Sequence, residues 1–356
     1  MPKRTRSKVR KLALAVTGSI ALMSVAACGG PPQQEDTESS GTVTLLGYSA
    51  VVQDNYQKAV VEPFEEEYPD ITVEYVPGDN AAKMLGTLRS EKDNPRTDVV
   101  IMDTSVAESG VKEGLFEELT AENIPNVENV VEQGRTEGGY AATFDSYVML
   151  YNKEKVTDSP TSWKELWEAP NQSVAIDAAP DIQGIALQRI VSEMEGDDYQ
   201  KDSKAAIKEL SELAPKVSSW APSPSPYQAI TDGGVSYATG WNARAQLFSN
   251  ESPDSLGVAT PGEGTIFQVN TVNMTKNSQH KKATQTFINY ALSPDAQKAF
   301  SEQMYYAPTV EGVKLNEDAS KRVVQPDSDA LLEMDWSWMA EHRDAWTEDW
   351  KREVIQ

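Results

Sequence analysis

The sequence of 356 residues contains one cysteine and two histidines. A single cysteine excludes a disulfide bond within the chain. His280 lies in a polar segment and His342 among charged residues, so we expect both to face solvent. The sequence has no HExxH motif, no zinc-type cysteine and histidine spacing, and no glycine-rich phosphate loop ending in Lys-Ser or Lys-Thr. It therefore indicates neither a metal site nor a bound cofactor.

Catalytic motifs are lacking as well. No GxSxG turn is present, and a Ser-His-Asp triad would have to use one of the two poorly placed histidines. A glycosidase-like pair of carboxylates is no specific signal, because 55 acidic residues supply such pairs in any fold. We expect that the protein is not an enzyme, and a secreted hydrolase is the less favoured alternative.

Basic residues are scarce relative to acidic ones. The chain has 32 Lys and Arg against 55 Asp and Glu, which gives a net charge of −23. Such a surface repels the phosphate backbone, so we exclude DNA and RNA as partners. The acidic excess does not identify a ligand, because most of these charges must lie on solvated faces.

The amino-terminal segment has the pattern of a secretion signal. Six basic residues precede an uncharged apolar stretch over 12–27, which is shorter than the roughly 20 residues of a membrane-spanning helix. The sequence Val25-Ala26-Ala27-Cys28 resembles a bacterial lipoprotein cleavage box, which implies a lipid on the sulfur of Cys28. The alternative is an ordinary signal peptide with an incidental cysteine. We expect a signal peptide over 1–27 and a flexible Gly-, Pro- and Ser-rich tether over 28–41.

The first part of the body predicts a parallel sheet. Strands expected at 42–46, 71–76 and 99–102 alternate with helices around 56–64 and 81–90. Ligands of such sheets bind beyond the carboxyl ends of the strands. Tyr48-Ser49 and Thr104-Ser105 follow two of these ends.

The rest of the body continues the alternation of strands and helices. We expect strands at 139–152, 174–176, 235–239, 255–260 and 267–274, and helices at 162–167, 185–193, 203–213, 243–248, 283–292 and 294–304. A final helix places Trp336, Met339, Trp346 and Trp350 on one face. We expect this stripe to pack the helix onto the body, with an aromatic ligand platform as the alternative.

Several segments together resemble a known family. The segments are 46–50, 64–73, 98–100, 113–116, 151–153, 161–167, Gly240–Ala245, Tyr306–Thr309 and 335–338. In this order they resemble the extracellular solute-binding proteins of ABC importers. Gly240–Ala245 is similar to the WNGSA segment of spermidine/putrescine-binding proteins, and Tyr306–Thr309 to their YPTP turn.

The resemblance implies an α/β fold with two periplasmic-binding-protein-like lobes, each a mixed, mostly parallel sheet flanked by helices. It places one lobe at 42–143 plus 268–356 with the carboxyl-terminal helices, the other at 144–267, and the ligand cleft at the hinge. The implied protein is a monomer that closes on a small molecule and delivers it to the permease and ATPase subunits. With the lipid anchor, it would sit on the outer face of the cytoplasmic membrane or in the periplasm.

We expect ten residues to bind the solute: Tyr48, Ser49, Thr104, Ser105, Ser146, Tyr147, Asp181, Trp241, Asn270 and Tyr306. The resemblance implies an aromatic contact at Trp241 and an acidic contact at Asp181, with a core tryptophan and a helix cap as their alternatives. Aromatic faces and carboxylates together suit a polyamine-like or other small amine.

The sequence departs from the polyamine pattern at two positions. Gln268 and Asn270 stand where those binders have an aromatic residue and an aspartate, which puts a long dication in doubt. A sugar, an amino acid derivative, a phosphonate or a ferric ion is the alternative solute. An anion would need arginines in the cleft; Arg189 and Arg244 are predicted inside helices, although Arg244 is close to Trp241.

Overall fold

The computed structural model describes residues 40–355. The predicted signal peptide, Cys28 and all but the last residues of the predicted tether lie outside the described residues. Between residues 40 and 355 no helix combines the length and the apolar character that crossing a membrane requires.

The strands form one connected β structure, in the order β2-β1-β3-β10-β5-β8-β6-β7. The short strands β4 and β9 each pair with β5 as well. The strands are β1 (Gly41–Tyr48), β2 (Ile71–Gly78), β3 (Val99–Asp103), β4 (Arg135–Thr136), β5 (Gly139–Asn152), β6 (Val174–Ala175), β7 (Val217–Ser219), β8 (Tyr237–Trp241), β9 (Leu256–Ala259) and β10 (Phe267–Met274).

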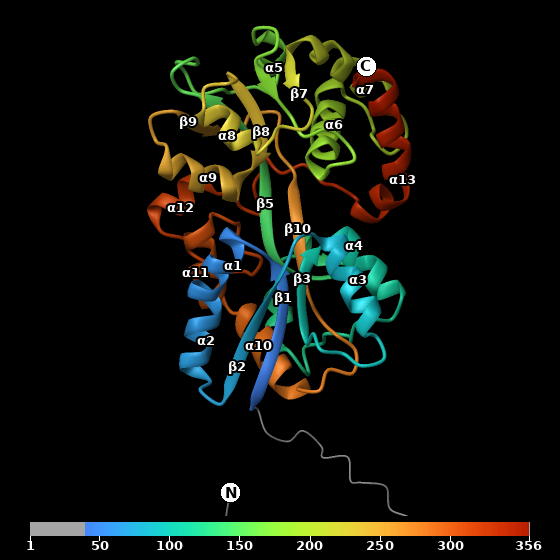
Figure 1. The fold of residues 1–356 in the computed structure, drawn as a ribbon, viewed down its shortest axis with the longest axis vertical. Coiled ribbons are helices and arrows are strands. Elements are labelled where there is room, and N and C mark those ends of the chain that lie inside the picture. The colour runs from blue at the N-terminus through green and yellow to red at the C-terminus, as the bar shows by residue number, and fades with distance from the viewer. Residues whose placement is uncertain (1–39, 356) are drawn as a thin grey trace, which may run out of the picture. The chain divides into compact units, whose positions relative to one another are not determined.

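Helices cover the strands on both faces (Figure 1). They are α1 (Val51–Tyr56), α2 (Glu62–Glu67), α3 (Ala81–Glu91), α4 (Thr104–Lys112), α5 (Glu165–Glu168), α6 (Ile182–Glu195), α7 (Lys204–Leu213), α8 (Pro226–Thr231), α9 (Asn242–Glu251), α10 (Lys281–Ala291), α11 (Pro294–Met304), α12 (Glu317–Arg322) and α13 (Trp336–Asp349). A π-helical segment, Gln57–Val61, joins α1 to α2, and another, Trp350–Val354, follows α13.

Strand β5 joins two lobes. Its first half pairs antiparallel with β10, and its second half, from Tyr147 to Asn152, pairs antiparallel with β8 and β9. The pairs β1–β2, β1–β3, β6–β7 and β6–β8 are parallel, as the alternation of strands and helices predicted. Figure 1 shows β5 and β10 running from the lower lobe into the upper one. The predicted α/β fold with mixed sheets is confirmed.

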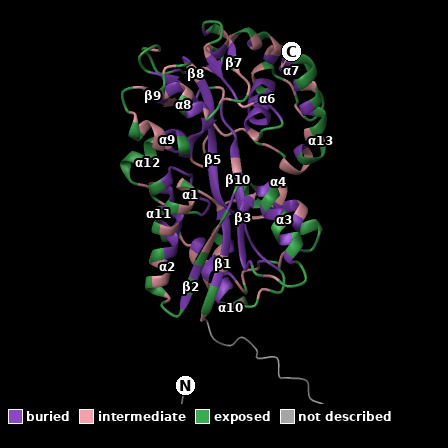
Figure 2. Ribbon diagram, in the orientation of Figure 1, coloured by how far each residue is buried: buried purple, intermediate pink, exposed green. Residues whose placement is uncertain are grey.

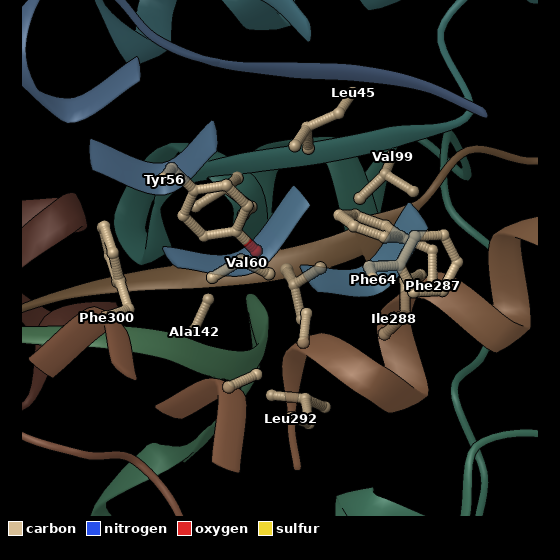
Figure 3. Close-up of a cluster of buried hydrophobic side chains, with 14 of the residues drawn as sticks. Leu45, Tyr56, Val60, Phe64, Val99, Ala142, Phe287, Ile288, Leu292 and Phe300 are labelled. Atoms are coloured by element: carbon tan, nitrogen blue, oxygen red, sulfur yellow. The ribbon is translucent and has the colours of Figure 1, made fainter. Parts of the chain in front are cut away.

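Each lobe has its own buried core, as the purple interior of Figure 2 shows. In the first lobe, Phe64 of α2 meets Phe287 of α10 edge-on at 5.1 Å, over Leu45 of β1 (Figure 3). In the second lobe, Trp163 and Ile185 are fully buried in a separate cluster. Burial of these side chains stabilises each half by the removal of apolar surface from water.

The last helix packs onto the body, as predicted. Met339, Trp346 and Trp350 are buried, and the indole N–H of Trp350 donates to Oε1 of Gln188 on α6 at 2.7 Å. Trp336, the remaining member of the stripe, is only partly buried.

The lobe division made from the sequence remains a prediction, and the carboxyl-terminal elements pack on both lobes. Helices α10 and α11 join the first-lobe core, whereas α13 packs on the second-lobe cluster of α6 and α7. This differs from the predicted grouping of 268–356 with the first lobe, because the tryptophan stripe fits the apolar surface of α6.

Candidate functional site

In the first lobe, the ends of β1 and β3 meet the middle of β10 at Tyr48. The Tyr48 hydroxyl accepts from the backbone N–H of Asp103 at 3.0 Å and donates to Oδ1 of Asn270 at 3.2 Å. Asn270 also donates to Oγ1 of Thr143 at 2.9 Å. Burial raises the pKa of Tyr48, so its phenol stays neutral. The predicted neighbours Tyr48 and Asn270 therefore do lie together, at the carboxyl end of β1.

The predicted hydroxyl residues of this lobe are engaged by the protein itself. Asp103 caps α4 by accepting from the backbone N–H of Ser105 at 3.0 Å and from its hydroxyl. The hydroxyls of Thr104 and Thr136 lie 2.7 Å apart, and the Ser49 backbone N–H donates to Gly78. These contacts position the end of β3.

A cavity of about 750 Å³ lies beside α4. It is lined by Thr104 and Glu108 of α4, by Phe267 of β10 and by the segment 331–337. Of the ten predicted site residues, Thr104 lines it. Its walls therefore come from other parts of the chain than the strand ends at Tyr48 and Trp241.

The middle of β5 holds a buried carboxyl group, Asp145, which the sequence analysis did not single out. Its Oδ1 accepts from the backbone N–H of Ala243 at 2.9 Å. Burial raises the pKa of Asp145 to about 7, and the N–H of Ala243 and the charge of Arg244 oppose that rise. The predicted residue beside it, Ser146, is buried opposite Phe267 of β10.

Tyr306 is buried in the first-lobe core. Its ring lies 5.4 Å from that of Phe300, and only 7 % of the residue is exposed. Burial raises the pKa of Tyr306, and the charge of Asp145 raises it further. The two residues are close, because Phe144 and Ala307, their neighbours in the chain, form a β-bridge.

Tyr147 and Trp241 form the aromatic part of the second lobe. They are paired across β5 and β8, with their ring centroids 5.4 Å apart in an edge-on arrangement. Tyr147 also stacks on Trp163 at 5.5 Å. Strand β8 continues to residue 241, two positions beyond its predicted end. Trp241 is consequently 8 % exposed.

Two carboxylates, Asp177 and Asp181, lie around the amino terminus of α6; together they are called the carboxylate pair below. Asp181 caps α6 by accepting from the backbone N–H of Gln183 at 2.9 Å. The side-chain amide of Gln183 donates to Oδ2 of Asp177 at 3.0 Å. Asp181 is thus a helix cap, as its alternative interpretation held, and it also lies beside a second acidic group.

Neither member of the carboxylate pair is in an ion pair, although the charge of Arg343 acts on Asp181. Neither carboxylate forms an ion pair with a lysine or arginine between residues 40 and 355. Burial and the neighbouring charge of Asp181 raise the pKa of Asp177 to about 6. Burial also raises the pKa of Asp181, although that residue keeps solvent exposure. Both carboxyls would be stabilised as anions by an incoming cation.

One unused acceptor adjoins this pair. Within residues 40–355, Oε1 of Gln183 is sealed from solvent and has no hydrogen-bond partner, whereas the hydroxyl of Tyr147 lies near that of Thr239. The charges of Asp177 and Asp181 both act on Tyr147 and raise its pKa. In the part of the chain that the structure describes, no group of three or more His, Cys, Asp or Glu could hold a metal ion.

Two arginines border the site, and the sequence analysis named only one of them. Nη2 of Arg343, on α13, donates to the carbonyl of Pro180 at 2.7 Å, and its charge opposes the rise in pKa that burial causes at Asp103 and Asp181. Arg244 is exposed in the first turn of α9. Arg343 could not be found from sequence because its proximity depends on how α13 packs.

Arg189 lies elsewhere. It pairs with Glu193, donates to the carbonyl of Glu333 and lies 4.8 Å from the ring centroid of Tyr199. These contacts hold its guanidinium within the second lobe and the segment before α13. Arg189 lines the cavity beside α4 and does not border the carboxylate pair.

Comparison with known proteins identifies the family. The family model for bacterial extracellular solute-binding proteins matches residues 59–326. The chain is 25% identical over 282 residues to the gamma-aminobutyric acid-binding protein of Pseudomonas aeruginosa, covering 77% of this chain and 78% of that protein. It is 25% identical over 290 residues to the spermidine/putrescine-binding periplasmic protein of Salmonella typhimurium, covering 78% and 82%.

A solved structure agrees with this result. An ABC transporter protein from Clostridium perfringens superimposes with a TM-score of 0.72 at 27% identity, covering 88% of this chain and 99% of that one. The resemblance inferred from the motifs is thereby confirmed, including the two-lobed fold. Members of the family bind a small molecule and deliver it to a membrane permease. The chain thus belongs to the bacterial extracellular solute-binding proteins, as the substrate-binding component of an ABC transporter for a small solute.

Proposed function

We propose that the solute is a small amine whose ammonium group binds at the carboxylate pair, Asp177 and Asp181. The observation that supports this most is the absence of an ion-pair partner for either carboxylate among residues 40–355. Charge-assisted hydrogen bonds from an ammonium to carboxylates are among the stronger polar contacts in proteins. The free amide oxygen of Gln183 offers a further acceptor for its N–H groups.

The aromatic residues beside the pair suit the rest of such a molecule. Trp241 at the end of β8 and Tyr147 in the middle of β5 lie edge-on to each other, and the charges of Asp177 and Asp181 act on Tyr147. An ammonium near an aromatic face gains cation–π attraction, and methylene groups gain apolar contact. The small exposed fraction of Trp241 limits its contact to one edge of the indole.

The other predicted site residues would contribute only weakly to the binding of a long dication. The side-chain amide of Asn270 accepts from Tyr48 and donates to Thr143, and it carries no charge that could balance an ammonium group. Gln268 has no charge either. A solute with a second ammonium far from the carboxylate pair would leave that ammonium poorly compensated, which is costly. A short amine is therefore favoured over spermidine-like molecules.

A thermal-shift experiment tests the amine proposal. The purified protein is heated with alkylamines, diamines, amino acids, sugars and ferric citrate. A ligand at 100 times its Kd stabilises the folded state by about 2.7 kcal/mol. We expect amines to raise the Tm and the substitution Asp177→Asn to remove that response. Asp158→Asn, at an exposed loop carboxylate, is the matched control and should leave it unchanged.

The proposal would be rejected if sugars or ferric citrate raised the Tm while no amine did. An amine response that survives both Asp177→Asn and Asp181→Asn would place the amine elsewhere. Turnover of a chromogenic ester or glycoside would show an enzyme, contrary to the expectation from the missing catalytic motifs.

We further propose that the protein acts as a monomer with Cys28 carrying a lipid anchor. The support is the sequence around Val25–Cys28, which resembles a lipoprotein cleavage box. Mass spectrometry of the protein purified from membranes tests it. A diacylglyceryl group on Cys28 is expected, and an unmodified thiol would contradict it.

A further inference from the structure

Arg244 is an unpaired guanidinium at the edge of the site. It lies in the first turn of α9, directly after Ala243, whose N–H holds Asp145, and close behind Trp241 at the end of β8. The side chain is exposed, and it makes no hydrogen bond or ion pair with any residue from 40 to 355. All five N–H donors of this guanidinium are therefore available to a ligand.

The surroundings of Arg244 come from both lobes. Its charge opposes the burial-driven rise in the pKa of Tyr48 on β1, of Tyr227 on α8 and of Tyr306. Tyr227 holds the end of β8, because its hydroxyl accepts from the backbone N–H of Trp241 at 2.8 Å. The guanidinium thus lies within electrostatic reach of the strand ends that border the site in each lobe.

Asp145 does not serve as the missing partner of Arg244. Its Oδ1 is occupied by the N–H of Ala243, and no ion pair joins the two side chains. Asp145 is also nearly sealed, with 3 % of the residue exposed. A buried carboxyl with a pKa of about 7 is only partly ionised at neutral pH. Arg244 therefore keeps its charge uncompensated by this neighbour.

The second arginine, Arg343, already has acidic neighbours. It donates to the carbonyl of Pro180, and its charge acts on Asp103 in the first lobe and Asp181 in the second. It thereby partly compensates those two carboxylates, and Asp177 is left as the carboxylate without a nearby arginine. The site thus has an acidic subsite at Asp177 and a separate basic subsite at Arg244.

We infer that the solute is a zwitterion, with an ammonium group held at the carboxylate pair and an anionic group, best a carboxylate, held by Arg244. An arginine binds a carboxylate through two parallel N–H donors, which a lone ammonium ligand would leave unused. A dication would in addition be repelled by Arg244 and Arg343. This inference rests on the proposed binding of an amine at Asp177 and Asp181, and it names the class of amine as an ω-amino acid.

Isothermal titration calorimetry tests the inference with ligands matched in length. ω-Amino acids of increasing chain length are compared with the alkylamine and the diamine that have the same number of carbons. We expect the best ω-amino acid to bind at least about tenfold more tightly than its matched amine and diamine, as expected for a charged hydrogen-bond pair. Arg244→Gln should remove that advantage without weakening the binding of the alkylamine.

The control is Arg89→Gln, which removes an exposed arginine paired with Glu113 on the first lobe and should change neither affinity. If Arg244→Gln does not fold, Arg244→Lys retains the charge without the two-pronged geometry and should lose part of the advantage. Tighter binding of a diamine than of every ω-amino acid would overturn the inference and leave the amine function standing. If no ω-amino acid, alkylamine or diamine binds, both the zwitterion inference and the proposed amine function are overturned.

Discussion

Burial raises the pKa of both Asp145 and Asp177, yet the environments of the two carboxyl groups differ. Asp177 is half-buried and open to a cation, whereas Asp145 is enclosed and bonded to the N–H of Ala243. Opening or occupying the site changes the surroundings of Asp177, but Asp145 stays within the strand that joins the lobes. The two residues therefore affect different properties, ligand affinity for Asp177 and stability for Asp145.

The pKa of Asp145 predicts a pH-dependent stability. A folded-state pKa of about 7 lies above the ordinary value of 3.8, so the folded protein binds this proton more tightly than the unfolded chain. The stabilising contribution is full below pH 3.8 and is lost as the pH rises to about 7. Asp145→Asn keeps an oxygen acceptor for Ala243 and cannot ionise. We expect the variant to gain Tm relative to the natural protein as the pH rises through this window.

Thermal unfolding of both proteins across this pH range measures the effect. Asp158→Asn, at the exposed loop, should follow the natural protein at every pH. Parallel curves for Asp145→Asn and the natural protein would show that the carboxyl of Asp145 does not titrate as its burial indicates.

Sequence reasoning found some site residues better than others. Tyr48 and Asp181 could be proposed from the sequence because Tyr48 stands at the end of a strand and Asp181 at the start of a helix. Arg343 could not be predicted from the sequence, because its side chain reaches Pro180 only when α13 packs on α6. Asp177 was visible as the residue after a strand, but its pairing with Gln183 depends on the turn between them.

At the scale of elements, the carboxylate pair depends on how closely α6 approaches the turn before it. Gly184 makes this possible, since a Cβ there would lie 2.1 Å from the backbone nitrogen of Ala179 and 2.5 Å from the carbonyl carbon of Ala178. Neither backbone atom can give way as a flexible side chain would. The glycine thus allows α6 to approach the turn that carries Asp177.

Gly184→Ala is therefore expected to push α6 from the turn, lower the Tm and weaken amine binding. Gly86→Ala in α3 is the matched control, because nothing lies within 4 Å of the added Cβ. Alanine in a helix interior is favoured over glycine by about 1 kcal/mol, so the control should keep or raise the Tm. Thermal unfolding and calorimetry measure both effects. Equal behaviour of the two variants would contradict the role given to Gly184.

The long strands were predictable with their observed bounds. Residues 139–152 and 267–274 are runs of apolar and β-branched side chains, and they form β5 and β10. The short elements α8 and α12 were not predicted, because six residues give too little periodicity and such helices depend on tertiary packing. The end of β8 was placed too early, since its last residues are fixed by pairing with β5 rather than by local propensity.

At the scale of the whole molecule, α13 touches both lobes. Its tryptophans are buried against the second lobe, while the hydroxyl of Ser337 at its start donates to Oε2 of Glu108 on α4 at 2.9 Å. Glu108 is buried and also pairs with Lys112. The lobes are thus linked by β5, by β10 and by this contact, and the proposed solute site draws residues from both.

A crystal structure of the protein grown with its best-binding ω-amino acid tests this account most directly. The account predicts the ligand nitrogen within about 3 Å of a carboxylate oxygen of Asp177 or Asp181, and its carboxylate facing Arg244. A ligand bound instead in the cavity between α4 and the segment 331–337, or with its nitrogen toward Arg244, would contradict it.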